Sequence, residues 1–268
     1  MALSAGKATT LLRSASLVLT AVLSSTLQEA RTKGAEKAWL TLATCTLLGA
    51  NVPSAVAHLY RFATRDDVEN AATRRELEEA LDKAALMREA ILKGISFLGV
   101  PRTILSMGCL HDTLEDDVKD HLRDEPLRIL TPGNVTQVLA RGEELAHSIY
   151  DSRLEELIPR FGLYHPDFPV VILQSYATIF APLPGGDAVQ GNLNRALSSV
   201  VAVACLRAEG GVGELLNGHV LGLLRARDEP GLSEGDYWVA SDEGAEWVLR
   251  TVDAILDVVK PDLGEGSV

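Results

Sequence analysis

Two histidines occupy positions from which a helix could present them as acid–base groups. His219 follows a glycine-rich break and lies two residues after Asn217, and His58 is closely followed by Tyr60 and Arg61. Imidazole has the ordinary pKa nearest to neutrality, so a histidine within hydrogen-bond reach of a substrate can act as a general base. We therefore predict His219 and His58 as catalytic residues, with Asn217 and Tyr60 as substrate contacts. The alternative for each histidine is an imidazole satisfied within the fold.

Further candidates lie in a predicted turn and near the C-terminus. Tyr164 and His165 lie in a predicted turn before the apolar segment 168–180, and loop residues held against a rigid core often contact substrates. We add Tyr164 as a catalytic candidate and His165 as a substrate contact, against the alternative of a capped turn with an exposed histidine. Trp238 belongs to a concentration of scarce aromatic residues and is a candidate pocket wall for a flat ligand, whereas packing is its alternative role.

An acidic motif raises the question of a metal site. Asp116, Asp117 and Asp120 form the DDxxD pattern that coordinates magnesium and diphosphate in isoprenoid enzymes. The second metal-binding triad of terpene cyclases is missing, and aromatic residues make up only 5% of the chain, which is poor for steadying carbocations. We expect a solvated acidic segment and no metal site, and a magnesium-dependent isoprenoid enzyme remains an alternative.

The elements that must position these residues are helices. Apolar residues recur at spacings of three and four, and no run alternates apolar and polar residues between turns. We predict an all-α protein whose apolar segment 168–180 is deeply buried. Its predicted helices include an N-terminal one and the ranges 40–48, 53–64, 66–98, 135–159, 193–207, 214–227 and 243–259.

The two halves of the chain show the same order of predicted elements. Residues 40–64 and 200–226 each contain a small-residue apolar helix with one cysteine, a glycine break and a second helix with a histidine. We predict an N-terminal helical half over 1–110, an acidic linker over 111–134 and a C-terminal half over 135–268, together forming one compact unit.

These segments resemble the AhpD/carboxymuconolactone decarboxylase-like superfamily. Residues 88–101 are similar to the family's C-terminal signature, an amphipathic helix ending in an aromatic residue, a glycine and a proline, and residues 193–227 are similar to the helical core that carries the family's histidine, here His219. The resemblance implies an all-α, AhpD-like fold with two related halves, and a homo-oligomer.

The sequence departs from the redox-active members of that family. Their Cys-x-x-Cys pair has a histidine four residues after its second cysteine, but the matching positions before His219 hold Val212 and Leu215, and those before His58 hold Asn51 and Ser54. Thiol–disulfide exchange needs an attacking and a resolving thiol. We therefore expect a divergent member without cofactors: a non-redox lyase, isomerase or cyclase that acts on a small, largely apolar substrate through orientation and His/Tyr hydrogen bonds.

Alternatives of other classes stay open, and composition limits the partners. A non-catalytic oligomeric module and a thiol peroxidase-like antioxidant protein are the further alternatives. The chain carries 37 acidic against 25 basic residues, a formal charge of −12, which argues against a nucleic-acid partner. No apolar run is long enough for a membrane span. We expect an intracellular, cytoplasmic protein with a small-molecule substrate, and the acid-free N-terminus leaves a mitochondrial location open.

Overall fold

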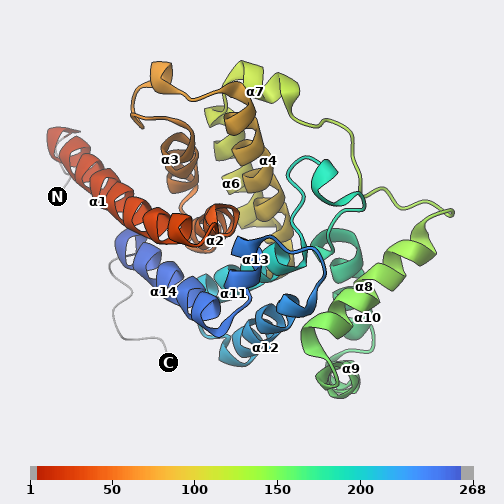
Figure 1. Cartoon of the computed structure of the whole chain (residues 1–268). Coiled ribbons are helices and arrows are strands. Elements are labelled where there is room, and N and C mark those ends of the chain that lie inside the picture. The colour runs from red at the N-terminus through yellow and green to blue at the C-terminus, as the bar shows by residue number, and fades with distance from the viewer. Residues whose placement is uncertain (1–4, 261–268) are drawn as a thin grey trace.

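The computed structural model describes residues 5–260, with side chains from residue 16, so the outermost residues of both expected halves lie outside the described range. This part of the chain is all-α, as predicted, and its only strand-like pairing is an isolated bridge between Arg65 and Arg74. The first helices (Figure 1) are α1 (Ala5–Thr32), α2 (Glu36–Gly49), α3 (Pro53–Thr64), α4 (Leu77–Lys93), α5 (Ile95–Leu98), α6 (Val100–Thr113) and α7 (Asp116–His121). After them come α8 (Val135–Tyr150), α9 (Arg153–Tyr164), α10 (Phe168–Ser175), the π-helical turn η2 (Tyr176–Phe180), α11 (Arg195–Glu209), α12 (Gly213–Arg225), α13 (Glu234–Val239) and α14 (Asp242–Val259).

Two helices form the centre of the molecule. Every residue from Ala38 to Gly49 of α2 is buried, and so is every residue from Arg195 to Leu206 of α11. A helix that is apolar around most of its circumference must be covered on all sides. Accordingly α2 and α11 pack against each other, and α14 packs against both. The chain then turns back after each central helix, into α3 and α12 respectively, so a helical hairpin occurs in each half.

The contact between α8 and η2 is unusually close. A Cβ atom added at Gly142 of α8 would lie 2.5 Å from the Ala177 Cβ atom and 2.6 Å from its Cα atom. Only glycine permits this approach, because the obstructing atoms include backbone that cannot rotate away. The approach brings the last residue of α8, Tyr150, beside Tyr176 of η2.

Two predicted helices differ from the observed ones. The helix expected from residue 66 starts at Leu77, because residues 66–76 form a turn in which the Asn70 side chain accepts a hydrogen bond from the Ala72 amide. The helix expected over 135–159 breaks at Asp151, whose φ is 53°. The expected linker 111–134 begins with the end of α6 and contains α7.

The expectation that 168–180 is deeply buried is wrong for its first half. Phe168, Val170 and Val171 are exposed, whereas Tyr176, Ala177 and Phe180 are buried. An apolar run without helical periodicity does not show which of its faces meets the core. No helix in the described residues has the length and apolar character needed to cross a membrane.

Candidate functional site

His219 lies at the centre of a closed aromatic cluster. The Tyr150 and Tyr176 hydroxyl oxygens are 3.1 and 3.3 Å from His219 Nε2, and 2.9 Å from each other. The Phe97 and Phe180 rings stand edge-on to the imidazole, at centroid distances of 5.2 and 6.4 Å. The side chains come from α12, α8, η2 and α5, so four elements enclose one imidazole.

The electrostatics of this cluster do not suit a general base. His219 is only 3% exposed, and burial, followed by the nearby Arg195 cation, lowers the pKa of His219 to about 3. Burial also raises the pKa of the Tyr150 and Tyr176 hydroxyls. All three groups are therefore neutral near pH 7, and the imidazole takes up a proton poorly. Within the described residues, Nδ1 of His219 is buried without a hydrogen-bond partner.

Two buried cations flank the cluster and hold irregular backbone. Lys93 Nζ donates to the Phe180 carbonyl oxygen, to that of Ala181 at 3.0 Å and to Ser198 Oγ at 3.1 Å. These bonds satisfy the carbonyls at the end of η2, although burial lowers the pKa of Lys93 to about 7. Arg195 donates to the Ser148 and Gly222 carbonyls at 3.0 and 2.9 Å, which ties α11 to α8 and α12.

His58 is satisfied in a similar, internal way. Its Nδ1 lies 3.3 Å from Ser16 Oγ and its Nε2 lies 2.9 Å from Thr20 Oγ1, both on α1. The side chain is 6% exposed, and burial, followed by the charge of Arg61, lowers the pKa of His58. Both ring nitrogens have partners, so this imidazole joins α3 to α1.

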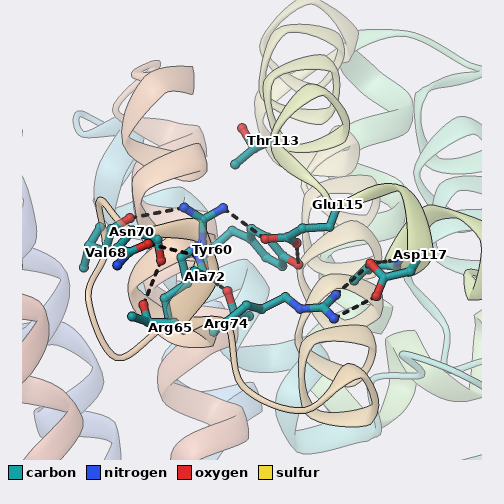
Figure 2. A network of polar contacts seen from close by, with 12 residues as sticks. Tyr60, Arg65, Val68, Asn70, Ala72, Arg74, Thr113, Glu115 and Asp117 are labelled. Carbon is teal, nitrogen blue, oxygen red and sulfur yellow. Dashed lines mark hydrogen bonds and ion pairs between the residues drawn. The ribbon is translucent and has the colours of Figure 1, made fainter.

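Tyr60 belongs to a network that fastens α3 to the start of α7 (Figure 2). Its hydroxyl donates to Glu115 Oε2 at 2.6 Å, while Arg65 Nη2 donates to Glu115 Oε1 at 3.0 Å. Arg74 adds a bidentate pair with Asp117, both distances being 2.7 Å. Burial and the bond to Glu115 raise the pKa of Tyr60. The Tyr60 hydroxyl is thereby engaged in holding helices together.

The same network accounts for much of the acidic motif. Asp117 is paired with Arg74, and Asp116 Oδ1 is 3.4 Å from Lys119 Nζ. In the described part of the chain, no group of three or more His, Cys, Asp or Glu side chains is arranged to hold a metal ion. Two of the three carboxylates of this motif, those of Asp116 and Asp117, thus interact with basic side chains of the protein.

The remaining predicted site residues lie apart from the His219 cluster or face outward. Tyr164 is exposed and its hydroxyl accepts a hydrogen bond from Arg160 at 2.9 Å, while His165 Nδ1 accepts one from the Asp167 amide at 3.1 Å. Asn217 is exposed although it shares α12 with His219. Trp238 packs on Trp247 at a centroid distance of 5.2 Å.

Cys45 and Cys205 meet across the contact between α2 and α11, a pairing that spacing within either half does not reveal. Both are buried free thiols. Burial, followed by the hydrogen bond with Cys45, raises the pKa of Cys205. A buried, protonated thiol is a poor nucleophile.

A cavity lies elsewhere, between α4, α6 and the segment 123–128. These two helices lie side by side (Figure 1), and the cavity has a volume of about 770 Å³. Its apolar lining comprises Ala85, Leu92, Ile95, Val100, Ile104, Met107, Leu114, Pro126 and Leu127. We call it the α4–α6 pocket. Pockets of this size and character hold small organic molecules.

The third side of this pocket is fixed in place by hydrogen bonds at both ends. The Arg123 amide donates to Gln190 Oε1 at 2.8 Å, and Arg128 forms a bidentate pair with Glu89 of α4. Glu89 is buried and also lies 4.0 Å from Lys93. The pocket is therefore bounded by two helices and a tethered loop.

A second cavity, of about 690 Å³, is lined by α1, α2, the 63–86 region and residues 187–192. Its charges are largely paired internally: Arg31 with Glu36, Arg75 with Asp66 and Glu79, and Lys83 with Glu79. Because of this pairing, the second cavity has fewer unpaired charged side chains available to a ligand than the α4–α6 pocket has. His219 lines neither cavity.

Comparison with family models, with curated proteins and with solved structures gives no match to this chain. The case for a function therefore depends on the geometry of the chain itself, above all on the α4–α6 pocket.

Proposed function

We propose that this protein binds a small, largely apolar organic molecule in the α4–α6 pocket. The observation that carries the proposal is the pocket itself: about 770 Å³, lined by apolar side chains of two helices together with polar and charged groups of α4, α6 and the segment 123–128. Apolar walls with a small number of orienting polar groups are typical of ligand sites. The wall segment 123–128 is tethered to both α4 and residue 190, which favours a preformed site.

This proposal keeps the substrate class expected from the sequence and moves its site. A lyase, isomerase or cyclase that uses His219 as its base has little support, because burial holds the pKa of His219 near 3. A thiol peroxidase has little support either, because Cys45 and Cys205 are buried and the pKa of Cys205 is raised. The helical hairpin that recurs in each half, with a cysteine and then a histidine, supports the further proposal of an AhpD-like fold.

A neutral fluorescent probe tests binding in the pocket. N-phenyl-1-naphthylamine should brighten when it enters the pocket. Gly108 lines the pocket, and a Cβ atom added there would meet no atom within 4 Å. Gly108→Phe should thus add a ring to the pocket wall at a position where its Cβ atom meets no obstruction, and should weaken probe binding at least tenfold.

Leu105→Phe is the matched control, because Leu105 lies on the same helix, is exposed and does not line the pocket. It should leave the probe affinity unchanged. Circular dichroism checks that both variants keep the helical content of the unmodified protein. Absence of probe binding to the unmodified protein, or equal affinities in both variants, would contradict the proposal.

A non-catalytic oligomeric module is the second candidate. The observation that favours it is a set of exposed apolar side chains on α9 and α10, two helices in contact, namely Leu163, Tyr164, Phe168, Val170 and Val171. Contiguous exposed apolar surface often marks a protein interface. Light scattering after size-exclusion chromatography tests this candidate: Val170→Glu with Val171→Glu should dissociate the oligomer, and a monomer at all concentrations in the unmodified protein would contradict it.

A further inference from the structure

Two arginines in the lining of the α4–α6 pocket lack carboxylate partners. Arg88 on α4 and Arg123 in the tethered segment both line the pocket. The described residues provide no carboxylate in ion-pair contact with either of them, whereas Arg128 in the same lining is paired with Glu89. The two terminal nitrogens of Arg88 reach only the Arg123 carbonyl oxygen, at 3.5 Å each, which is at the outer limit of a hydrogen bond.

The two guanidinium groups also disfavour each other. Both side chains are half-buried. Arg123 Nη1 donates to the Glu125 carbonyl oxygen, but Arg123 Nε is buried with no hydrogen-bond partner among the described residues. Burial, followed by the neighbouring Arg123 charge, lowers the pKa of Arg88. An anion placed between two like positive charges in a partly desolvated site offsets their electrostatic repulsion.

The acidic groups near the pocket set a limit on the charge of that anion. Glu89 is the buried carboxylate of the lining, and Arg128 compensates its charge. Asp124 and Glu125 also line the pocket but are exposed to solvent. Three guanidinium groups therefore face one buried carboxylate, while two exposed carboxylates disfavour an anion of high charge.

We propose that the α4–α6 pocket takes a singly charged organic acid: a carboxylate with an apolar body, whose head group Arg88 and Arg123 hold. The inference rests on the proposed function and adds the chemical class of the ligand. Guanidinium groups match the geometry of a carboxylate and form charge-assisted hydrogen bonds with it. The apolar body then lies against the side chains of α4 and α6, notably Ile95, Ile104 and Met107.

A competition experiment at pH 7.5 tests this assignment. Octanoate and 1-octanol are compared as competitors that displace bound N-phenyl-1-naphthylamine, because they share a chain length and differ in charge. Octanoate should bind about tenfold or more tightly than 1-octanol, since hydrogen bonds between a guanidinium group and a carboxylate are stronger than those to a neutral hydroxyl. Octyl phosphate, which carries more charge, should bind more weakly than octanoate.

Arg88→Gln and Arg123→Gln should each reduce the preference for octanoate about tenfold and leave the affinity for 1-octanol unchanged. Arg227→Gln is the control, because Arg227 is exposed and lies outside the pocket. Equal binding of octanoate and 1-octanol overturns the assignment of an acid while the proposed function stands. Failure of all three competitors to displace a bound probe likewise overturns the assignment of an acid. Absence of probe binding to the unmodified protein overturns this assignment and the proposed function together. An equal loss in Arg227→Gln indicates unspecific attraction and also overturns it.

Discussion

His219→Gln should change how the stability of this protein depends on pH. Burial holds the pKa of His219 near 3 in the folded chain, against an ordinary value of 6.5. Between these values the unfolded chain binds a proton that the folded chain excludes, so the stability due to the neutral imidazole is complete above pH 6.5 and is lost as the pH falls toward 3. Each pH unit in this window corresponds to at most about 1.4 kcal/mol. From pH 6.5 to 4.5 the loss amounts to about 2 kcal/mol, which is a large part of an ordinary stability of about 5–15 kcal/mol.

Urea unfolding followed by circular dichroism at pH 6.5, 5.5 and 4.5 measures this effect. Glutamine carries no charge at any of these pH values, so the free energy of unfolding of the original protein should fall by about 2 kcal/mol more than that of the variant over this range. The comparison removes the contributions of all groups that titrate equally in both proteins. Parallel curves for the two proteins, or an imidazole that titrates near pH 6.5 in the folded chain, would refute the closed-cluster description.

Three further substitutions test the contacts that position the helices, with urea unfolding as the measurement. Gly142→Ala should lower the free energy of unfolding by about 1–3 kcal/mol, because its methyl group meets Ala177; unchanged stability would show that α8 and η2 can separate without cost. Tyr60→Phe should lower it by about 1–2 kcal/mol, because Glu115 loses a hydrogen bond, and an increase in stability would contradict the role of this network. For Lys93, whose pKa is lowered to about 7 by burial, the unfolded chain holds the extra proton above pH 7. The free energy of unfolding of the unmodified protein, relative to that of Lys93→Met, should thus rise from pH 7 to 10 by at most about 1.4 kcal/mol per pH unit. A difference between the two proteins that does not change with pH would argue against a buried, titrating amine.

Local patterns predicted the central elements of the fold well. The apolar spacing and glycine breaks around α2, α3, α11 and α12 placed these helices within a few residues of their observed ends, because a buried helix and its terminating glycine leave local signals. The helix predicted over 66–98 began too early, because aspartates such as Asp66 and Asp67 favour turns and helix starts alike. The break at Asp151 requires a positive φ that nothing in the adjacent sequence demands.

The sequence predicted the site residues less completely, for a physical reason. His219 and His58 were predicted as chemical groups from their residue types, but their burial depends on neighbours contributed by other helices: Tyr150, Tyr176 and Thr20. Arg88 and Arg123 lie on separate elements, so no spacing motif unites them. Arg123 lies in the acidic segment 111–134, whereas Arg88 lies within α4, and neither position carries a local signal for an anion site.

The position of a bound acid in the folded protein tests the central claim most directly. With methyl groups labelled for NMR, addition of octanoate should shift the signals of Ile95, Ile104 and Met107, which line the α4–α6 pocket. Signals near His219, such as those of Val220, should stay in place. Saturable shifts confined to the pocket are the predicted result, whereas shifts centred on the His219 cluster, or no saturable shift at all, would contradict the account.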